Sequence, residues 1–312
     1  MGLLECRGGP LDSGGVGTQA GQVSTMMGII GIVVVFVMVF GGYIMVGGHI
    51  GVIIEALPHE LMTIGGGAVG ALLIGNTPST LKGIGSDIKQ VFSGPKWKEQ
   101  DFKDMLCLLF TITKMIKSKG ILVIESHIEK PEESSIFQKY PRIMHDHFAV
   151  NFICDTLRML SMNLDDPHQV FDNMEAQLEK HHHEHMMPQH ALQNMADGLP
   201  AIGIVAAVLG VIHTMGSVTE PPEVLGGMIG SALVGTFMGV FLAYMLVGPF
   251  SVRLKQVMDD EHRFYLIIRD VMVAHLNGNA PQVSVEIGRG NVPSLVQPSF
   301  FELEEALNAT SE

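Results

Sequence analysis

The chain has little charge, few aromatic residues and very little cysteine. Only 16% of its 312 residues are charged and 6% are aromatic, whereas 47% are hydrophobic. A charged fraction this small excludes an ordinary soluble domain. Basic residues are the scarcer ones, with 19 Lys and Arg against 32 Asp and Glu, for a net charge of −13. Because neutralising phosphates requires an excess of Lys and Arg, this balance excludes a nucleic-acid-binding protein.

The scarcity of cysteine is equally restrictive. Cys6, Cys107 and Cys154 lie far apart and follow no disulfide or metal-binding spacing, so we expect packing thiols. Glycine, by contrast, is abundant, with 36 residues gathered in and around the apolar runs. Small residues let helices pack closely in lipid.

Long apolar runs occur in two pairs on either side of a charged middle segment. They lie at residues 26–46, 61–75, 199–218 and 225–250. The first run has about 20 residues, enough to span hydrocarbon. The second is shorter and by length alone could be a buried helix, but its Gly and Ala content favours a tightly packed span. We therefore predict an all-α membrane protein with four transmembrane helices.

None of these runs contains Asp, Glu, Lys or Arg. A membrane protein that moves ions usually has an ionisable residue within the bilayer. Either this chain moves no ions, or a partner supplies the titrating group.

The runs divide the chain into five segments. We predict a flexible N-terminal extension at 1–25, a transmembrane hairpin at 26–76, a cytoplasmic helical domain at 77–198, a second hairpin lining the ion path at 199–250, and a cytoplasmic C-terminal helix and tail at 251–312. The middle segment shows helical periodicity at 104–120, 145–163 and 166–187. In the last of these, Asp165 or Asp166 is the expected N-cap, with Pro167 in the first turn.

The distribution of lysine and arginine predicts the orientation. The short connections 47–60 and 219–224 contain none, whereas the middle segment carries many, and Arg253 and Lys255 follow the fourth run. Positive residues favour the cytoplasmic side, so the middle segment and both termini are expected there.

Polar or helix-distorting residues near the spans are the first candidates for function. Pro200 begins the third run, where the first turn of a helix tolerates proline. Pro249 instead removes a backbone bond late in the fourth span and favours a kink, a hinge or a wet path. The hydroxyl of Thr236 either bonds back to its own helix or faces a pore. Ala207 offers no side-chain oxygen, which weakens a sodium site and favours protons.

Three further patterns are weaker. Lys117 and Glu125 lie in a charged stretch that is a solvated face unless it serves recognition. The histidines at 181–185 have a spacing that suits zinc, but a solvated polar face is the simpler interpretation, and we predict no metal. GGGAVG at 65–70 has no preceding strand, so we interpret it as helix packing rather than nucleotide binding.

Four stretches resemble one family. They are similar to the MotA flagellar stator subunits of the MotA/TolQ/ExbB proton-channel group. The stretches are FGGYIMVGGHIG at 40–51, ESHIEKPEESSIFQKYPRI at 125–143, DGLPAIGIVAAVLGVIHTMGS at 197–217 with LVGTFMGVFLAYMLVGP at 233–249, and VEIGRG with PSFFELEE at 285–305. The similarity runs from about residue 27 to 307, and four spans favour MotA over the usually three-span TolQ and ExbB.

The resemblance implies a function. MotA-like subunits form a homopentamer around MotB-like partners, which supply an essential aspartate. Ion flow drives rotation, and the cytoplasmic domain pushes on the rotor protein FliG. By resemblance, the ion path includes Pro200, Ala207, Thr236 and Pro249, and the rotor-facing pair is Lys117 and Glu125. Many relatives have arginine where this chain has Lys117, which keeps the charge but loses the planar fork.

We therefore expect a multi-pass inner-membrane subunit that is not an enzyme, has no cofactor and carries H⁺ rather than Na⁺. The alternatives are a proton-driven energiser of the TolQ/ExbB type and a membrane scaffold without ion flux.

Overall fold

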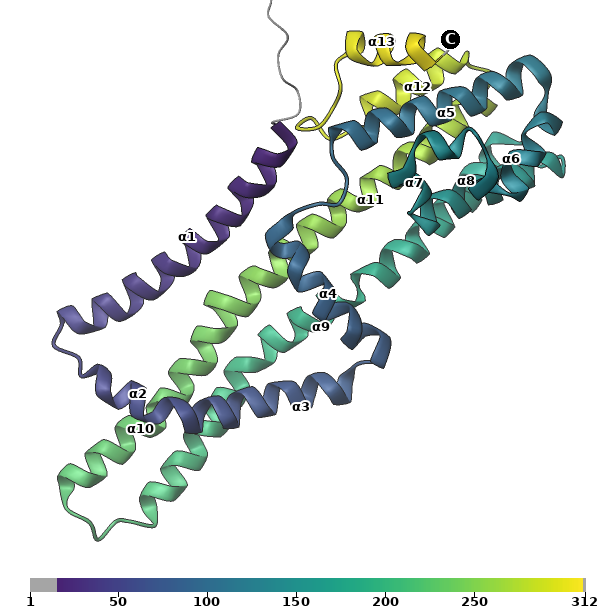
Figure 1. Ribbon diagram of the computed structural model, residues 1–312. Coiled ribbons are helices and arrows are strands. Elements are labelled where there is room, and N and C mark those ends of the chain that lie inside the picture. The colour runs from purple at the N-terminus through teal and green to yellow at the C-terminus, as the bar shows by residue number, and fades with distance from the viewer. Residues whose placement is uncertain (1–15, 311–312) are drawn as a thin grey trace, which may run out of the picture.

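The computed structural model describes residues 16–310, and every regular element in this range is a helix (Figure 1). Four of the described helices are long and apolar enough to cross a membrane, which confirms the all-α, four-span prediction. The main helices are α1 (Val16–Met45), α2 (Ile50–Glu60), α3 (Gly66–Gly75), α4 (Pro78–Ser93), α5 (Glu99–Lys119), α8 (His147–Ser161), α9 (Pro167–Met215), α10 (Pro222–Phe241), α11 (Gly248–Leu276), α12 (Pro281–Gly290) and α13 (Phe300–Thr310).

The first span, α1, is a single helix whose apolar side chains point outward over most of its length. Its membrane-capable part is Met26–Met45. The helix begins at Val16, so residues 16–25 of the predicted extension are helical, while residues 1–15 lie outside the described residues.

The second span is longer than predicted and contains acidic residues. α2, a π-helical segment at Leu61–Gly65 and α3 follow one another without a break, so the membrane-capable helix is Ile50–Gly75. The prediction that the spans lack acidic residues is therefore wrong, because the added turns carry Glu55 and Glu60. Pro58 lies inside α2, where it looks like a helix end in the sequence but is accommodated within the helix.

The third span is the C-terminal part of a much longer helix. α9 has 49 residues and joins the predicted helix 166–187 to the predicted span 199–218. At its start, the Asp166 side chain accepts a hydrogen bond of 2.8 Å from the His168 amide, with Pro167 in the first turn, which confirms the predicted cap. At 1.5 Å per residue the helix is roughly 70 Å long.

The fourth span likewise continues out of the membrane. α10, a π-helical segment at Leu242–Val247 and α11 form one uninterrupted helix from Pro222 to Leu276. In Figure 1, α9 runs beside α10 from the loop between them and then beside α11 toward the opposite end of the molecule.

A helical domain surrounds the ends of α9 and α11 that lie away from the membrane, and we call it the distal domain. It consists of those two ends together with α5, α6 (Glu125–Glu129), α7 (Pro141–Met144), α8, α12 and α13. Its core contains fully buried side chains from most of these helices, among them Leu109, Phe152, Met174, Phe264 and Val285. The indole of Trp97 stacks on the Phe264 ring with 3.9 Å between centroids. One continuous apolar core therefore holds the distal domain to the two long helices that enter the membrane.

Candidate functional site

The third and fourth spans approach each other at glycines. A Cβ atom on Gly203 would lie 2.9 Å from the Cα of Gly239, and one on Gly239 would lie 2.8 Å from the Leu199 carbonyl oxygen. Because the nearest atoms are backbone, only glycine allows the two helices to come this close. The predicted close packing at Gly235 and Gly239 is confirmed, whereas Gly226 has open space around it.

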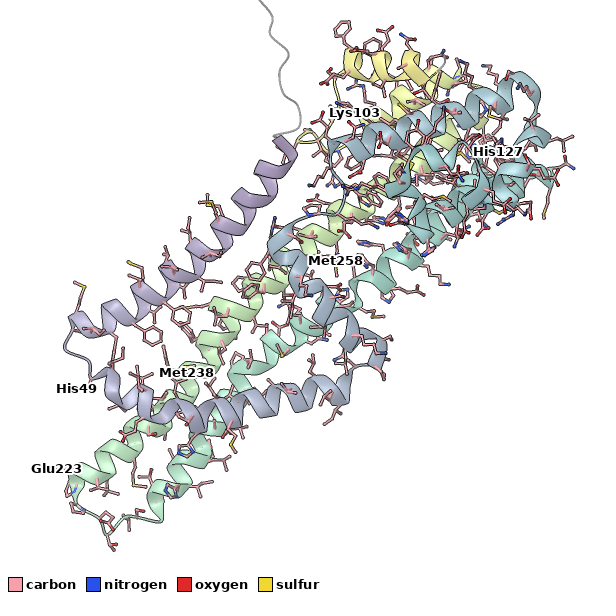
Figure 2. All side chains as sticks on the ribbon, in the orientation of Figure 1. His49, Lys103, His127, Glu223, Met238 and Met258 are labelled. Carbon is pink, nitrogen blue, oxygen red and sulfur yellow. The ribbon has the colours of Figure 1, made fainter. Side chains whose placement is uncertain are left out.

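The antiparallel register of this contact is set by three facing pairs. Gly203 faces Gly239, Ala206 faces Gly235, and Gly210 faces Ala232 in the next turns. Ala207 and Thr236 directly follow Ala206 and Gly235, so they lie at the same level of the hairpin. Figure 2 places Glu223 at the loop end of α10 and Met238 farther along, where α10 passes the second span.

The hydroxyl of Thr236 is available to another molecule. Thr214 donates to the Gly210 carbonyl at 2.9 Å, and Thr63 donates to the His59 carbonyl at 3.0 Å, so both bond back to their own helices. Within the described residues Thr236 makes no such bond. Of the two interpretations of Thr236, the back-bonded one is therefore not what the structure shows.

Pro200 lies in the interior of α9 and not at a helix start, so the prediction of a first-turn proline is wrong. Its missing N–H leaves the carbonyl of Ala196 without the usual partner four residues on. Leu199, the residue before it, contacts Gly239 through its carbonyl oxygen. Pro200 is thus brought to the same part of the hairpin as Ala207 and Thr236.

Pro249 lies apart from these residues. It follows the π-helical segment Leu242–Val247, in which backbone hydrogen bonds join residues five apart. The backbone N–H that proline lacks is therefore missing next to a part of the helix that already departs from the α-helical pattern. With α1 and α4 it lines an apolar groove of about 460 Å³ that also contains Phe92 and Phe250. The structure therefore does not place Pro249 beside Thr236.

Glu60 is the membrane residue that sequence reasoning missed. Its side chain is 8% exposed and packs where a side chain on Gly235 would be, since a Cβ there would lie 2.7 Å from Glu60 Oε2. A signal was present: Ile50, Val52 and Ile53 begin an apolar helical pattern that runs into the assigned span. Pro58, His59 and Glu60 interrupt this apolar pattern, so the sequence did not show that the helix continues through them.

GGGAVG at 65–70 lies in the second span as part of a continuous helix. A Cβ on Gly67 would meet the Ile202 side chain at 3.1 Å, so this glycine packs against α9. The interpretation as helix packing is confirmed at Gly67, while its neighbours Gly65, Gly66 and Gly70 have no such contact.

Lys117 and Glu125 are exposed. The helices that carry them, α5 and α6, belong to the distal domain, at the end of the molecule opposite the loop between α9 and α10 (Figure 1). Lys117 lies in the last turn of α5, and Glu125 begins the short helix α6 (Glu125–Glu129). Gly120, with a φ of 83°, ends α5 between them. In the described part of the chain neither side chain takes part in an ion pair, so both remain available to a partner.

The histidine cluster 181–185 is more buried than predicted. The His181 ring stacks on Phe148 with 3.5 Å between centroids, and burial lowers the pKa of His181 to about 4. His185 Nε2 lies 3.3 Å from Glu261 Oε2, and this hydrogen bond raises the pKa of His185. The interpretation as a solvated face is wrong for these two rings. Within residues 16–310 no three His, Cys, Asp or Glu side chains are placed to hold a metal ion.

Comparisons with known proteins identify the family. Residues 29–120 match the Motility protein A N-terminal family, and residues 144–265 match the MotA/TolQ/ExbB proton channel family. The chain is 37% identical over 284 residues to motility protein A of Salmonella typhimurium, covering 91% of this chain and 96% of that protein. The chain belongs to the motility protein A family. Motility protein A of Escherichia coli is 36% identical with the same coverage, and chemotaxis protein LafT of Vibrio parahaemolyticus is 33% identical, covering 90% of this chain and 98% of that protein.

Solved structures show the same fold. The Campylobacter jejuni MotAB structure superposes with a TM-score of 0.65 at 19% identity, covering 87% of this chain and 96% of that chain. The flagellar MotAB stator complex from Bacillus subtilis gives 0.61 at 22% identity, covering 83% and 92%. The predicted resemblance and fold class are confirmed. Membership of the motility protein A family favours motility over the TolQ/ExbB alternative.

Proposed function

We propose that this chain is the membrane subunit of a proton-driven flagellar stator, in which a MotB-like partner contributes the ion-binding aspartate. Membership of the motility protein A family within a proton channel family carries the proposal. The crossing of α9 and α10 supports it, because Thr236 lies one turn from the Gly203–Gly239 contact and its hydroxyl makes no hydrogen bond among the described residues.

The ion is H⁺ in this proposal. A metal cation that sheds water needs several oxygen ligands in its place. Ala207 lies level with Thr236 and brings no side-chain oxygen, so this part of the wall offers few ligands to Na⁺. A proton needs only a single carboxylate, which the partner supplies. Motility that collapses without sodium yet survives a proton uncoupler would contradict this assignment.

The assembly consists of a homopentamer around the partner, with the distal domain and both termini in the cytoplasm. The many exposed apolar side chains of α1 and of the membrane part of α9 support burial by lipid and neighbouring subunits. The lysine-rich segment between the second and third spans supports the orientation. Lys117 and Glu125 are exposed at the distal end, where they reach the rotor protein FliG.

Protonation of the partner's aspartate couples ion flow to movement in this proposal. A carboxylate is costly to expose to an apolar wall, and a proton removes that cost. The two protonation states therefore favour different packing against Pro200, Ala207 and Thr236, which makes the contact a two-state element.

Swimming assays test the proposal directly. The variants Pro200→Ala and Thr236→Ala, expressed with the partner in a strain lacking its own motility protein A, should both impair swimming while the protein is still made. Gly230→Ala is a matched control, because its Cβ would meet Val52 at an ordinary 3.6 Å. Normal motility in both variants would refute the assigned roles. Purified alone in liposomes, the chain should show no proton leak above background.

A further inference from the structure

The second span contains a carboxyl group that the proposed stator function does not use. Glu60 lies near the middle of the membrane helix Ile50–Gly75, about 15 Å from its start at 1.5 Å per residue. The side chain is 92% buried, from its 8% exposure, and its Oε2 atom has no hydrogen-bond partner within the described residues. Glu55, the other acidic residue of this helix, is exposed.

The carboxyl group occupies a space that glycine leaves open in the fourth span. A Cβ on Gly235 would lie 2.7 Å from Oε2 and 3.1 Å from Cδ of Glu60. Gly235 also faces Ala206, and Thr236 is the next residue. The Glu60 carboxyl is therefore packed one residue away from the candidate ion path, on the side of α10 that faces the second span.

The backbone around Glu60 is altered on both sides. Pro58 removes an amide two residues before it, and the π-helical segment Leu61–Gly65 begins directly after it. π-helical turns are rare and occur frequently at functional sites. The regular α-helical hydrogen-bond pattern is therefore interrupted on both sides of the residue that carries the carboxyl.

Few charges face this group. His59, its neighbour on α2, is exposed. Among the described residues of the elements packed on α2, the ionisable side chains are Tyr43 in α1 and Glu223 in α10, and Glu223 is at the far loop end. α9 also comes close, because Ala206 shares the space beside Gly235, and its nearest ionisable residues along the helix are Asp197 and His213, at least about 10 Å from Ala206 at 1.5 Å per residue. His59 is the one adjacent side chain that can carry a positive charge, and it acts on Glu60 from an exposed position. Because the carboxylate has no buried partner among these residues, its charge is costly.

We propose that Glu60 is a proton-binding site in the wall of the membrane domain, which takes up and releases a proton beside the Thr236 turn. In uptake, one carboxylate oxygen forms an O–H bond as an O–H bond breaks in the donor, which is hydronium (leaving water) or the partner's protonated aspartate (leaving its carboxylate). Release passes the proton back to water or to a carboxylate and restores the Glu60 carboxylate. The neutral acid is the form packed on Gly235. The charged form exists when the contact between α2 and α10 opens. The link to transport rests on the proposed stator function.

Proton uptake by vesicles containing the chain with its partner tests this link. Glu60→Gln is neutral, of similar shape and unable to titrate, so it should reduce proton flux about a hundredfold, the scale of a positioned proton-transfer group. Glu55→Gln, on the same helix but exposed, should leave the flux unchanged. If Glu60 served only as a neutral packing group, Glu60→Gln would conduct like the wild type, and that result overturns the proposal.

Infrared spectroscopy separates this site from the proposed function. The purified wild-type complex should show a protonated-carboxyl band that changes with pH, is missing in Glu60→Gln and persists in Glu55→Gln. If Glu60→Gln does not assemble with the partner, the same spectrum is recorded for Glu60→Asp, in which the protonated-carboxyl band should remain at a shifted frequency. A pH-independent spectrum in this region overturns the site. Wild-type vesicles without proton flux would instead overturn the stator function and leave the band as the test of Glu60.

Discussion

The close contact of α9 and α10 predicts that Gly239→Ala damages the protein, although alanine is the better helix former. The added Cβ would lie 2.8 Å from Gly203 Cα and from the Leu199 carbonyl oxygen, whereas ordinary contacts begin at 3.4 Å. Restoring an ordinary contact therefore requires the two backbones to separate by about 0.6 Å, the difference of those two distances. Both neighbours are backbone atoms, so no change of rotamer relieves the contact.

The expected cost is that of overpacking a close helix contact, about 1–3 kcal/mol. Replacing glycine by alanine within a helix favours the folded helix by about 1 kcal/mol, which opposes this cost. Gly230→Ala gains the same propensity term in the same helix but meets only Val52 at 3.6 Å. The difference between the two variants isolates the contact, and it should equal the overpacking cost.

Thermal denaturation of the detergent-solubilised complex, with swimming measured in parallel, provides the assay. Gly239→Ala should unfold at a lower temperature than Gly230→Ala. It should also swim poorly, because separating the two helices moves Thr236, which lies one turn from Gly239. Gly203→Ala should behave like Gly239→Ala, since it meets the same contact from the other side. Equal denaturation midpoints for Gly239→Ala and Gly230→Ala would refute the inferred register.

Three further outcomes are expected. Lys117→Glu should abolish swimming without lowering the amount of protein, because an exposed charge at the distal end is reversed; normal swimming would contradict its rotor role. Burial lowers the pKa of His181 and of His262 to about 4, from an ordinary 6.5. Folding therefore favours the neutral rings, so the stability they contribute is present above pH 6.5 and is lost as the pH falls toward 4. Urea denaturation across this range should show the decline, and His262→Gln should flatten it; an unchanged slope would contradict the burial argument. Cys107 and Cys154 are buried, and burial raises the pKa of Cys154 to about 11, so neither should react with a thiol reagent at neutral pH until the protein is denatured.

Local polarity predicted much of this protein. An apolar run long enough to cross hydrocarbon has few alternatives to a helix, because unpaired backbone groups are too costly in lipid. The number of spans, the all-α class and the helical middle segment therefore followed from the amino acids alone. The helix start before Pro167 was also predictable, although the sequence left Asp165 and Asp166 as alternative caps and the structure shows Asp166.

Helix continuity was not predictable in the same way. Pro58 and Pro200 look like helix boundaries in the sequence, yet both lie inside helices whose neighbours hold the chain in place. Proline costs a helix one hydrogen bond, and only the packing around it decides whether the helix ends or continues. The predicted breaks near residues 61 and 199 were misplaced for this reason.

By itself, the sequence determined that four helices cross a membrane, which family they resemble, and which residues are candidates for the ion path. Only the tertiary structure showed that Gly203 meets Gly239, that the fourth span leaves a space at Gly235, and that the Glu60 carboxyl fills it. These contacts join segments more than 100 residues apart or lying on different helices, and their register depends on the three-dimensional fit of backbones and small side chains. Neither composition nor periodicity encodes that fit, because both describe the neighbours of a residue along the chain and not those across it.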